Sequence, residues 1–121
     1  MDKVHEERYL NGQLKERATY KMVMDGRYEA WHENGTLSER SYFKNGKLNG
    51  VRKCWYDNGQ LMLHEIYKDG KRDGLAEEWY DTCKLMNRIN YKNGKRDGVC
   101  EWWAESGELV LHEIYKDGIK V

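Results

Sequence analysis

The chain has 121 residues, 35 % of which are charged, and its 21 acidic and 21 basic residues cancel to a formal net charge of zero. A nucleic-acid-binding protein usually has an excess of basic residues, which this chain does not have. Aromatic residues reach 12 %, which together with zero net charge argues against a disordered chain. Apolar runs stop at three residues, whereas a membrane span needs about 20 and a signal peptide a core of about 7–15. We therefore expect one ordered domain over residues 1–121 in the cytoplasm.

The three cysteines, Cys54, Cys83 and Cys100, are an odd set without the spacing of a metal or redox motif. Free thiols in a reducing intracellular compartment are the simplest interpretation. Cys54 and Cys100 are expected to be inert, partly buried thiols rather than nucleophiles. No cofactor or metal is predicted.

Several residue types recur every 24 residues along the chain, which marks a repeat protein. Glycine, tryptophan, leucine and an aromatic residue each form such a column. The columns are Gly26, Gly50, Gly74 and Gly98; Trp31, Trp55, Trp79 and Trp103; Leu37, Leu61, Leu85 and Leu109; Phe43, Tyr67, Tyr91 and Tyr115; and Gly46, Gly70, Gly94 and Gly118. Because all four column types keep one period, we interpret them as structural positions.

In chain order, we expect a divergent first unit at about 5–26, three units at 27–50, 51–74 and 75–98, and a last unit at about 99–118. Met22-Val23-Met24 shortens the second turn of the first unit by one residue. Within 51–74, two β-prone runs flank Asn58-Gly59 and a second glycine-rich turn follows, so each unit predicts two strands and two turns. The predicted fold is all-β: a single-layer, twisted antiparallel meander of stacked hairpins with about ten strands.

The first turn of each unit is expected to bring its tryptophan opposite its leucine. Trp55 and Leu61 pair only if the loop is Asp57-Asn58-Gly59, with Gly59 in the left-handed region of a G1 bulge. In the unit at 75–98, Thr82-Cys83 replaces Asn-Gly. A left-handed cysteine is unfavourable, so we expect that turn to be distorted.

The string from Trp55 to Leu61, WYDNGQL, and the string from Tyr67 to Gly74, YKDGKRDG, resemble the 24-residue variant of the MORN repeat. The resemblance spans about residues 9–118. It implies an elongated sheet of stacked hairpins that acts as a scaffold, binding itself, other proteins or phospholipid membranes. It also implies no catalytic residues. This variant is common in bacterial proteins described as antitoxins and in large DNA viruses of protists.

Strand alternation predicts the use of the two sheet faces. The tryptophans, the leucine column, the Phe/Tyr column and Val51, Leu75 and Val99 are expected on one face, as its main apolar layer. The other face varies between units and mixes aromatic with basic residues, as contact surfaces do. Its candidate contact residues are Tyr56, Tyr80, Trp102, Arg40, His64, Arg88 and His112.

One row of turns carries many basic residues, and its candidate anionic contact is Lys71, Arg72, Lys95 and Arg96. Two explanations of these charges remain open. They can simply keep the turns solvated, or they can bind lipid headgroups or an acidic protein. The outer strands, near 3–10 and 108–116, leave edges that can recruit a second copy or a partner strand.

The sequence contains few candidates for a metal or catalytic site. His64 and His112 lie two units apart, roughly 19 Å by strand spacing, which is too far to share a metal. Glu65 and Glu113 fail as a glycosidase pair for the same reason. The favoured interpretation is a non-enzymatic scaffold for protein–protein contact that also dimerises. An antitoxin that binds its toxin, and an adaptor at an anionic membrane, remain open alternatives.

Overall fold

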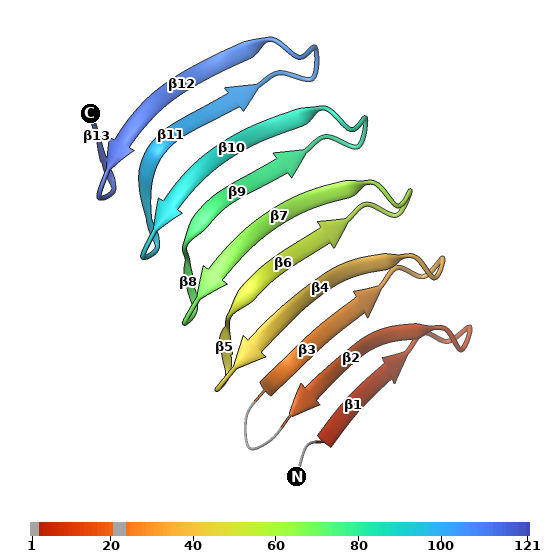
Figure 1. Ribbon diagram of the computed structural model, residues 1–121. Helices are drawn as coiled ribbons and strands as arrows, with labels where there is room; N and C mark the ends of the chain where they lie inside the picture. Colours follow the sequence, from red (N-terminus) through yellow and green to blue (C-terminus); the bar gives the residue numbers. More distant parts are fainter. Residues whose placement is uncertain (1–2, 21–23) are drawn as a thin grey trace.

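The computed structural model describes residues 3–20 and 24–121, and all strands in these segments belong to one open antiparallel sheet. Figure 1 shows the strands following one another across the sheet, curved along their length and twisted. The strands are β1 (Lys3–Arg8), β2 (Leu14–Tyr20), β3 (Met24–Trp31), β4 (Leu37–Lys44), β5 (Lys47–Leu48), β6 (Gly50–Trp55), β7 (Leu61–Lys68), β8 (Lys71–Arg72), β9 (Gly74–Trp79), β10 (Leu85–Lys92), β11 (Lys95–Trp103), β12 (Leu109–Lys116) and β13 (Ile119–Lys120).

The predicted meander of hairpins is confirmed, although the structure divides it into 13 strands rather than about ten. Three strands, β5, β8 and β13, have two residues each and only close the second turns. β5 and β8 are each separated from β6 and β9 by a single residue outside the strands, Asn49 and Asp73. The proposed shortening at Met22-Val23-Met24 falls largely outside the described residues.

The first turn of the unit at 51–74 is the predicted three-residue loop. Trp55 lies opposite Leu61, and the amide of Gly59, at φ +85°, donates to the carbonyl of Tyr56 at 2.9 Å. The expected distortion at Cys83 is wrong. Cys83 takes φ +71°, and its amide donates to the carbonyl of Tyr80 at 3.0 Å, which is the same geometry.

The second turns are two-residue loops in which an Asn or Asp precedes the glycine. Both residues have positive φ, as in Asp69 (+50°) and Gly70 (+82°), the type I′ geometry that Asx-Gly favours. Each turn is fastened to the preceding unit: the amide of Asp69 donates to Asn49 Oδ1 at 3.1 Å, and the amide of Gly70 donates to the carbonyl of Leu48 at 2.8 Å. The same amide-to-side-chain contact recurs every 24 residues, each time joining residues that are 20 positions apart, so it helps to stack the units.

A β-bulge one residue after each leucine reverses the alternation of the second strand. Trp55 pairs with Leu61, but Cys54 already pairs with Leu63, so Met62 is the extra residue. The second half of the strand therefore presents His64 and Ile66 beside Trp55, and Glu65 and Tyr67 on the other side. We name the first side the Trp face; it contains Trp31, Trp55, Trp79, Trp103 and the other side chains that point to that side of the sheet. We name the opposite side the Cys face; it contains Cys54, Cys100 and the other side chains that point there.

This reversal corrects the predicted faces. The columns Phe43, Tyr67, Tyr91 and Tyr115 lie on the Cys face, because they pair with Gly26, Gly50, Gly74 and Gly98, which share that face. Most buried residues lie there as well, namely Ala18, Ser41, Glu65, Ala76, Asn87, Ile89 and Cys100. The main buried layer is thus on the Cys face, whereas the tryptophans are only partly buried.

Candidate interaction surfaces

The Cys face pairs its own charges. Glu65 is 2 % exposed and binds Arg52 Nη1 at 2.9 Å and Arg72 Nε at 2.7 Å. Arg52 also reaches Glu39 at 3.1 Å, and Tyr67 donates to Glu65 at 3.2 Å. Burial opposes the charge on Arg52, but hydrogen bonds to Glu39 and Glu65 outweigh it and raise its pKa. These charges hold the sheet together and are not free for a partner.

Tyr56 and Tyr80, two of the predicted contact residues, belong to a column of hydrogen bonds between units. The hydroxyl of Tyr56 donates to the carbonyl of Trp79 at 2.6 Å, and that of Tyr80 donates to the carbonyl of Trp103 at 2.8 Å. Tyr9 and His32 make the equivalent contacts to Trp31 and Trp55. The structure therefore gives both tyrosines a stacking role that sequence reasoning missed.

The predicted contact residues do not share one face, which corrects their grouping. Tyr56, Tyr80 and Trp102 lie on the Cys face, and the guanidinium of Arg96 lies 5.3 Å from the Trp102 ring. Arg40, His64, Arg88 and His112 lie on the Trp face, because the bulge shifts them there. The latter four form a column across the strands of the sheet.

That column is part of a ladder of alternating charges on the Trp face. Acidic residues of the first strands pair with basic residues of the second strands: Glu6 with Arg17 at 2.8 Å, Glu29 with Arg40 at 3.3 Å, Glu77 with Arg88 at 3.2 Å and Glu101 with His112 at 3.1 Å. The hairpin β6–β7 departs from the pattern, because Lys53 stands opposite His64. Lys53 was not singled out from the sequence. The signal was the repeat itself, because glutamate occupies the equivalent position in three other units, at Glu29, Glu77 and Glu101.

Accessible apolar side chains occur near the two ends of the described chain, where Val4, Leu10, Ile119 and Val121 are 62 % to 110 % exposed, and also on the Trp face and along β12. On the Trp face, Tyr42 is 38 % exposed and Ile114 is 48 % exposed. On the edge strand β12, Leu109, Val110 and Leu111 are 45 %, 60 % and 43 % exposed. The edge is open because, among the described strands, β12 pairs fully with β11 and only at Tyr115 and Lys116 with β13.

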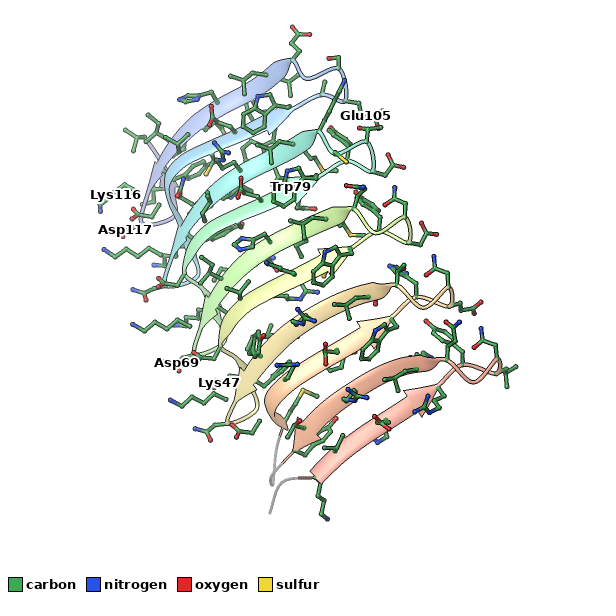
Figure 2. All side chains as sticks on the ribbon, turned by 45° about the vertical axis from the view of Figure 1, so that its right-hand side comes forward. Lys47, Asp69, Trp79, Glu105, Lys116 and Asp117 are labelled. Atoms are coloured by element: carbon green, nitrogen blue, oxygen red, sulfur yellow. The ribbon has the colours of Figure 1, made fainter. Side chains whose placement is uncertain are left out.

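The two rows of turns differ in charge. Figure 2 shows Lys47, Asp69, Lys116 and Asp117 along one row, and Glu105 on the opposite row. Of the predicted anionic-contact residues, Lys71 and Lys95 are exposed, and their side chains lie over Gly94 and Gly118 of the next turn. Arg72 and Arg96 instead turn to the Cys face and lie 5.2 Å from the Tyr91 ring and 5.4 Å from the Tyr115 ring. The four residues thus form two separate sets.

The family model described as "MORN repeat variant" matches residues 1–22, 24–45, 48–69 and 96–117. The matched segments cover most of the chain, which therefore belongs to the MORN repeat family. Repeats of this family form non-catalytic scaffolds that contact proteins or membranes. No curated protein matches the chain. In the described part of the chain, no helix is long and apolar enough to cross a bilayer.

Proposed function

We propose that this protein is a non-enzymatic scaffold that binds a protein partner through its Trp face. The observation that carries this proposal is the asymmetry between the faces. The Cys face holds most of the buried side chains, whereas the Trp face combines four partly buried tryptophans with the accessible side chains of Tyr42 and Ile114. Aromatic, apolar and arginine side chains together are typical of protein interfaces.

Two substitutions on the last long strand provide a matched test. Ile114→Glu places a charge on the Trp face, and Leu111→Glu places it on the Cys face of the same strand at similar exposure. Tagged proteins are purified from their native cells and the co-purifying proteins are identified by mass spectrometry. We expect a stoichiometric partner to be retained by wild type and Leu111→Glu and lost by Ile114→Glu. Retention by both variants contradicts the proposal.

The identity of the captured protein also separates an assembly scaffold from an antitoxin. A partner that is toxic when expressed alone, and harmless when co-expressed with this chain, supports the antitoxin role. A non-toxic partner contradicts it. Both results leave the Trp face as the proposed binding surface.

Self-association is the second proposed role, and the open edge of β12 supports it. An exposed edge strand can pair with a strand of another copy, and Leu109 to Leu111 give this edge accessible apolar side chains. We expect sedimentation equilibrium at tens of micromolar to report a dimer or larger species. The double substitution Val110→Lys and Leu111→Lys should return it to monomer, because lysine disfavours edge pairing. A wild-type monomer at that concentration contradicts this role.

An adaptor at an anionic membrane is the remaining candidate, and the exposed Lys71 and Lys95 favour it. It predicts co-sedimentation with phosphatidylserine-containing vesicles that weakens with salt, since exposed charges are screened. The double substitution Lys71→Gln and Lys95→Gln should reduce binding further. Arg72→Gln is a poor test, because Arg72 is paired with Glu65. Absent or salt-insensitive binding contradicts this candidate.

A further inference from the structure

The hairpins β6–β7 and β11–β12 contain the same eight-residue string, Leu63 to Gly70 and Leu111 to Gly118, in the same register. They differ at the residue opposite the histidine. His112 lies opposite Glu101, and its Nδ1 is 3.1 Å from the carboxylate. His64 lies opposite Lys53, and its Nδ1 is buried with no hydrogen-bond partner in the described structure. The presence of a lysine in place of an acid leaves one imidazole unsatisfied.

Lys53 also changes the ladder on its other side. Arg40 of β4 lies opposite Lys53 of β6, which lies opposite His64 of β7, so three basic residues stand in succession. At every other described step of the ladder a carboxylate separates the bases. Lys53 forms no ion pair with a described residue. Lys53 therefore carries a positive charge that the described part of the sheet does not compensate.

The neighbouring carboxylates are already engaged. Glu29 is 6 % exposed and binds Arg40 at 3.3 Å and Arg27 at 3.9 Å. Glu77 lies opposite His64 but binds Arg88 at 3.2 Å. Neither neighbouring carboxylate is therefore free to complete the ladder at Lys53.

The three bases surround a hollow of about 310 Å³ that is also lined by Tyr42 and Val51. Its polar wall suits an anion, and the aromatic and aliphatic wall suits the hydrocarbon part of an acidic side chain. The imidazole of His64 can turn about its Cβ–Cγ bond, since that torsion is broad. Such a turn would exchange the positions of Nδ1 and Cδ2, so that a protonated Nδ1 could donate a hydrogen bond to an anion in the hollow.

We propose that Arg40, Lys53 and His64 form a carboxylate-binding site for an acidic segment of a protein partner. A carboxylate is favoured over other anions because glutamate fills the equivalent position in the other hairpins, 2.8 to 3.3 Å from its base. The site deepens the protein-binding role proposed above and rests on it. Its location on the Trp face places an acidic side chain next to the accessible ring of Tyr42.

The test uses a fluorescently labelled hexaglutamate peptide and its binding to the full chain by anisotropy. Lys53→Glu recreates the Glu101–His112 arrangement, so the variant should fold and unfold at the same or a higher temperature. It should bind the peptide about tenfold more weakly or worse, because a charged pair becomes a repulsion. Lys71→Glu makes the same change of net charge on the row of turns and should bind like wild type.

The reverse substitution, Glu101→Lys, offers a gain of function. It places three bases in succession on β10, β11 and β12, because Arg88 and His112 lie on either side of position 101. This arrangement matches the three bases Arg40, Lys53 and His64, although Asn90 stands at the position equivalent to Tyr42. We expect the peptide stoichiometry to rise from one site to two. The double variant Lys53→Glu and Glu101→Lys should bind one peptide, and that peptide should bind at the new site on β10, β11 and β12.

Unchanged peptide binding in Lys53→Glu, or equal loss in Lys71→Glu, overturns the proposal. Binding of anionic vesicles that depends on Lys53, without binding of the peptide, overturns the assignment to a protein carboxylate. These results are independent of the purification experiment. If the protein-binding role of the Trp face is wrong, the purification experiment reveals it, because Ile114→Glu then still retains the partner. That result does not depend on whether the peptide binds.

Discussion

The two faces of the sheet use similar residue types to different effect. On the Cys face, Glu65 lies between Arg52 and Arg72 and is almost fully buried. On the Trp face, Glu101 pairs with His112 alone among the described residues and both side chains remain partly exposed, although Glu29 of the same face is 6 % exposed between Arg27 and Arg40. A single-layer sheet has no second layer to cover it, so one face must supply most of the buried contacts. The face that contributes least to stability is then available for binding.

The largest expected effect comes from removing the central carboxylate of the Cys face. Glu65→Gln leaves Arg72 without its carboxylate and Arg52 with Glu39 alone. Because both arginines reach solvent, we expect a loss of about 1.5–3 kcal/mol, the range for hydrogen bonds to charged groups. Chemical denaturation measures the free energy of unfolding. The matched variant on the Trp face is Glu101→Gln, for which we expect less than about 1 kcal/mol, as for exposed pairs. Equal losses would remove the distinction between the faces.

A smaller effect is expected from the column of hydrogen bonds between units. Tyr56→Phe removes the hydroxyl that donates to the carbonyl of Trp79 at 2.6 Å. The loss should be about 1 kcal/mol, the usual net value of such a bond. Tyr42→Phe is the control on the Trp face, because that hydroxyl has no hydrogen bond among the described residues and the ring is 38 % exposed. Its free energy of unfolding should stay within error of wild type.

The smallest perturbation probes the Cys face by thiol chemistry. Burial raises the pKa of Cys54 to about 11, against the opposing effect of nearby Arg52, and burial also raises the pKa of Cys100. Cys83 is exposed on a turn. At pH 8 we expect iodoacetamide to modify Cys83 first, since the thiolate is the reactive form. The rate at Cys54 should rise about tenfold per pH unit until about pH 11. Mass spectrometry of peptides measures each site, and rapid modification of Cys100 would contradict the buried layer.

The period, the hairpins and the two turn types could be predicted from the sequence because each depends on local residues. Gly59 and the Asx-Gly pairs need positive φ, and Trp55 and Leu61 pair as soon as the loop length is known. The faces could not be predicted with simple alternation, because the bulge at Met62 reverses it within the strand. The wrong assignment of Tyr67 and His64 follows from that one residue.

The interaction surfaces were harder to predict for a related reason. Tyr56 resembles an exposed contact residue until the carbonyl of Trp79 in the next unit is found beside it. Lys53 stands out only when its partners across two neighbouring strands are known. Both contacts join residues that are 11 to 23 positions apart, and a face must be assigned correctly before either can be inferred.

The central claim is that the Trp face, and not the Cys face, meets the protein partner. Photo-crosslinking in the native cells tests it most directly, with benzoylphenylalanine placed at Tyr42 on the Trp face or at Leu111 on the Cys face, which are 38 % and 43 % exposed. We expect the probe at Tyr42 to give a discrete cross-linked protein and the probe at Leu111 to give none. Cross-linking from Leu111 alone, or equally from both positions, would contradict the claim.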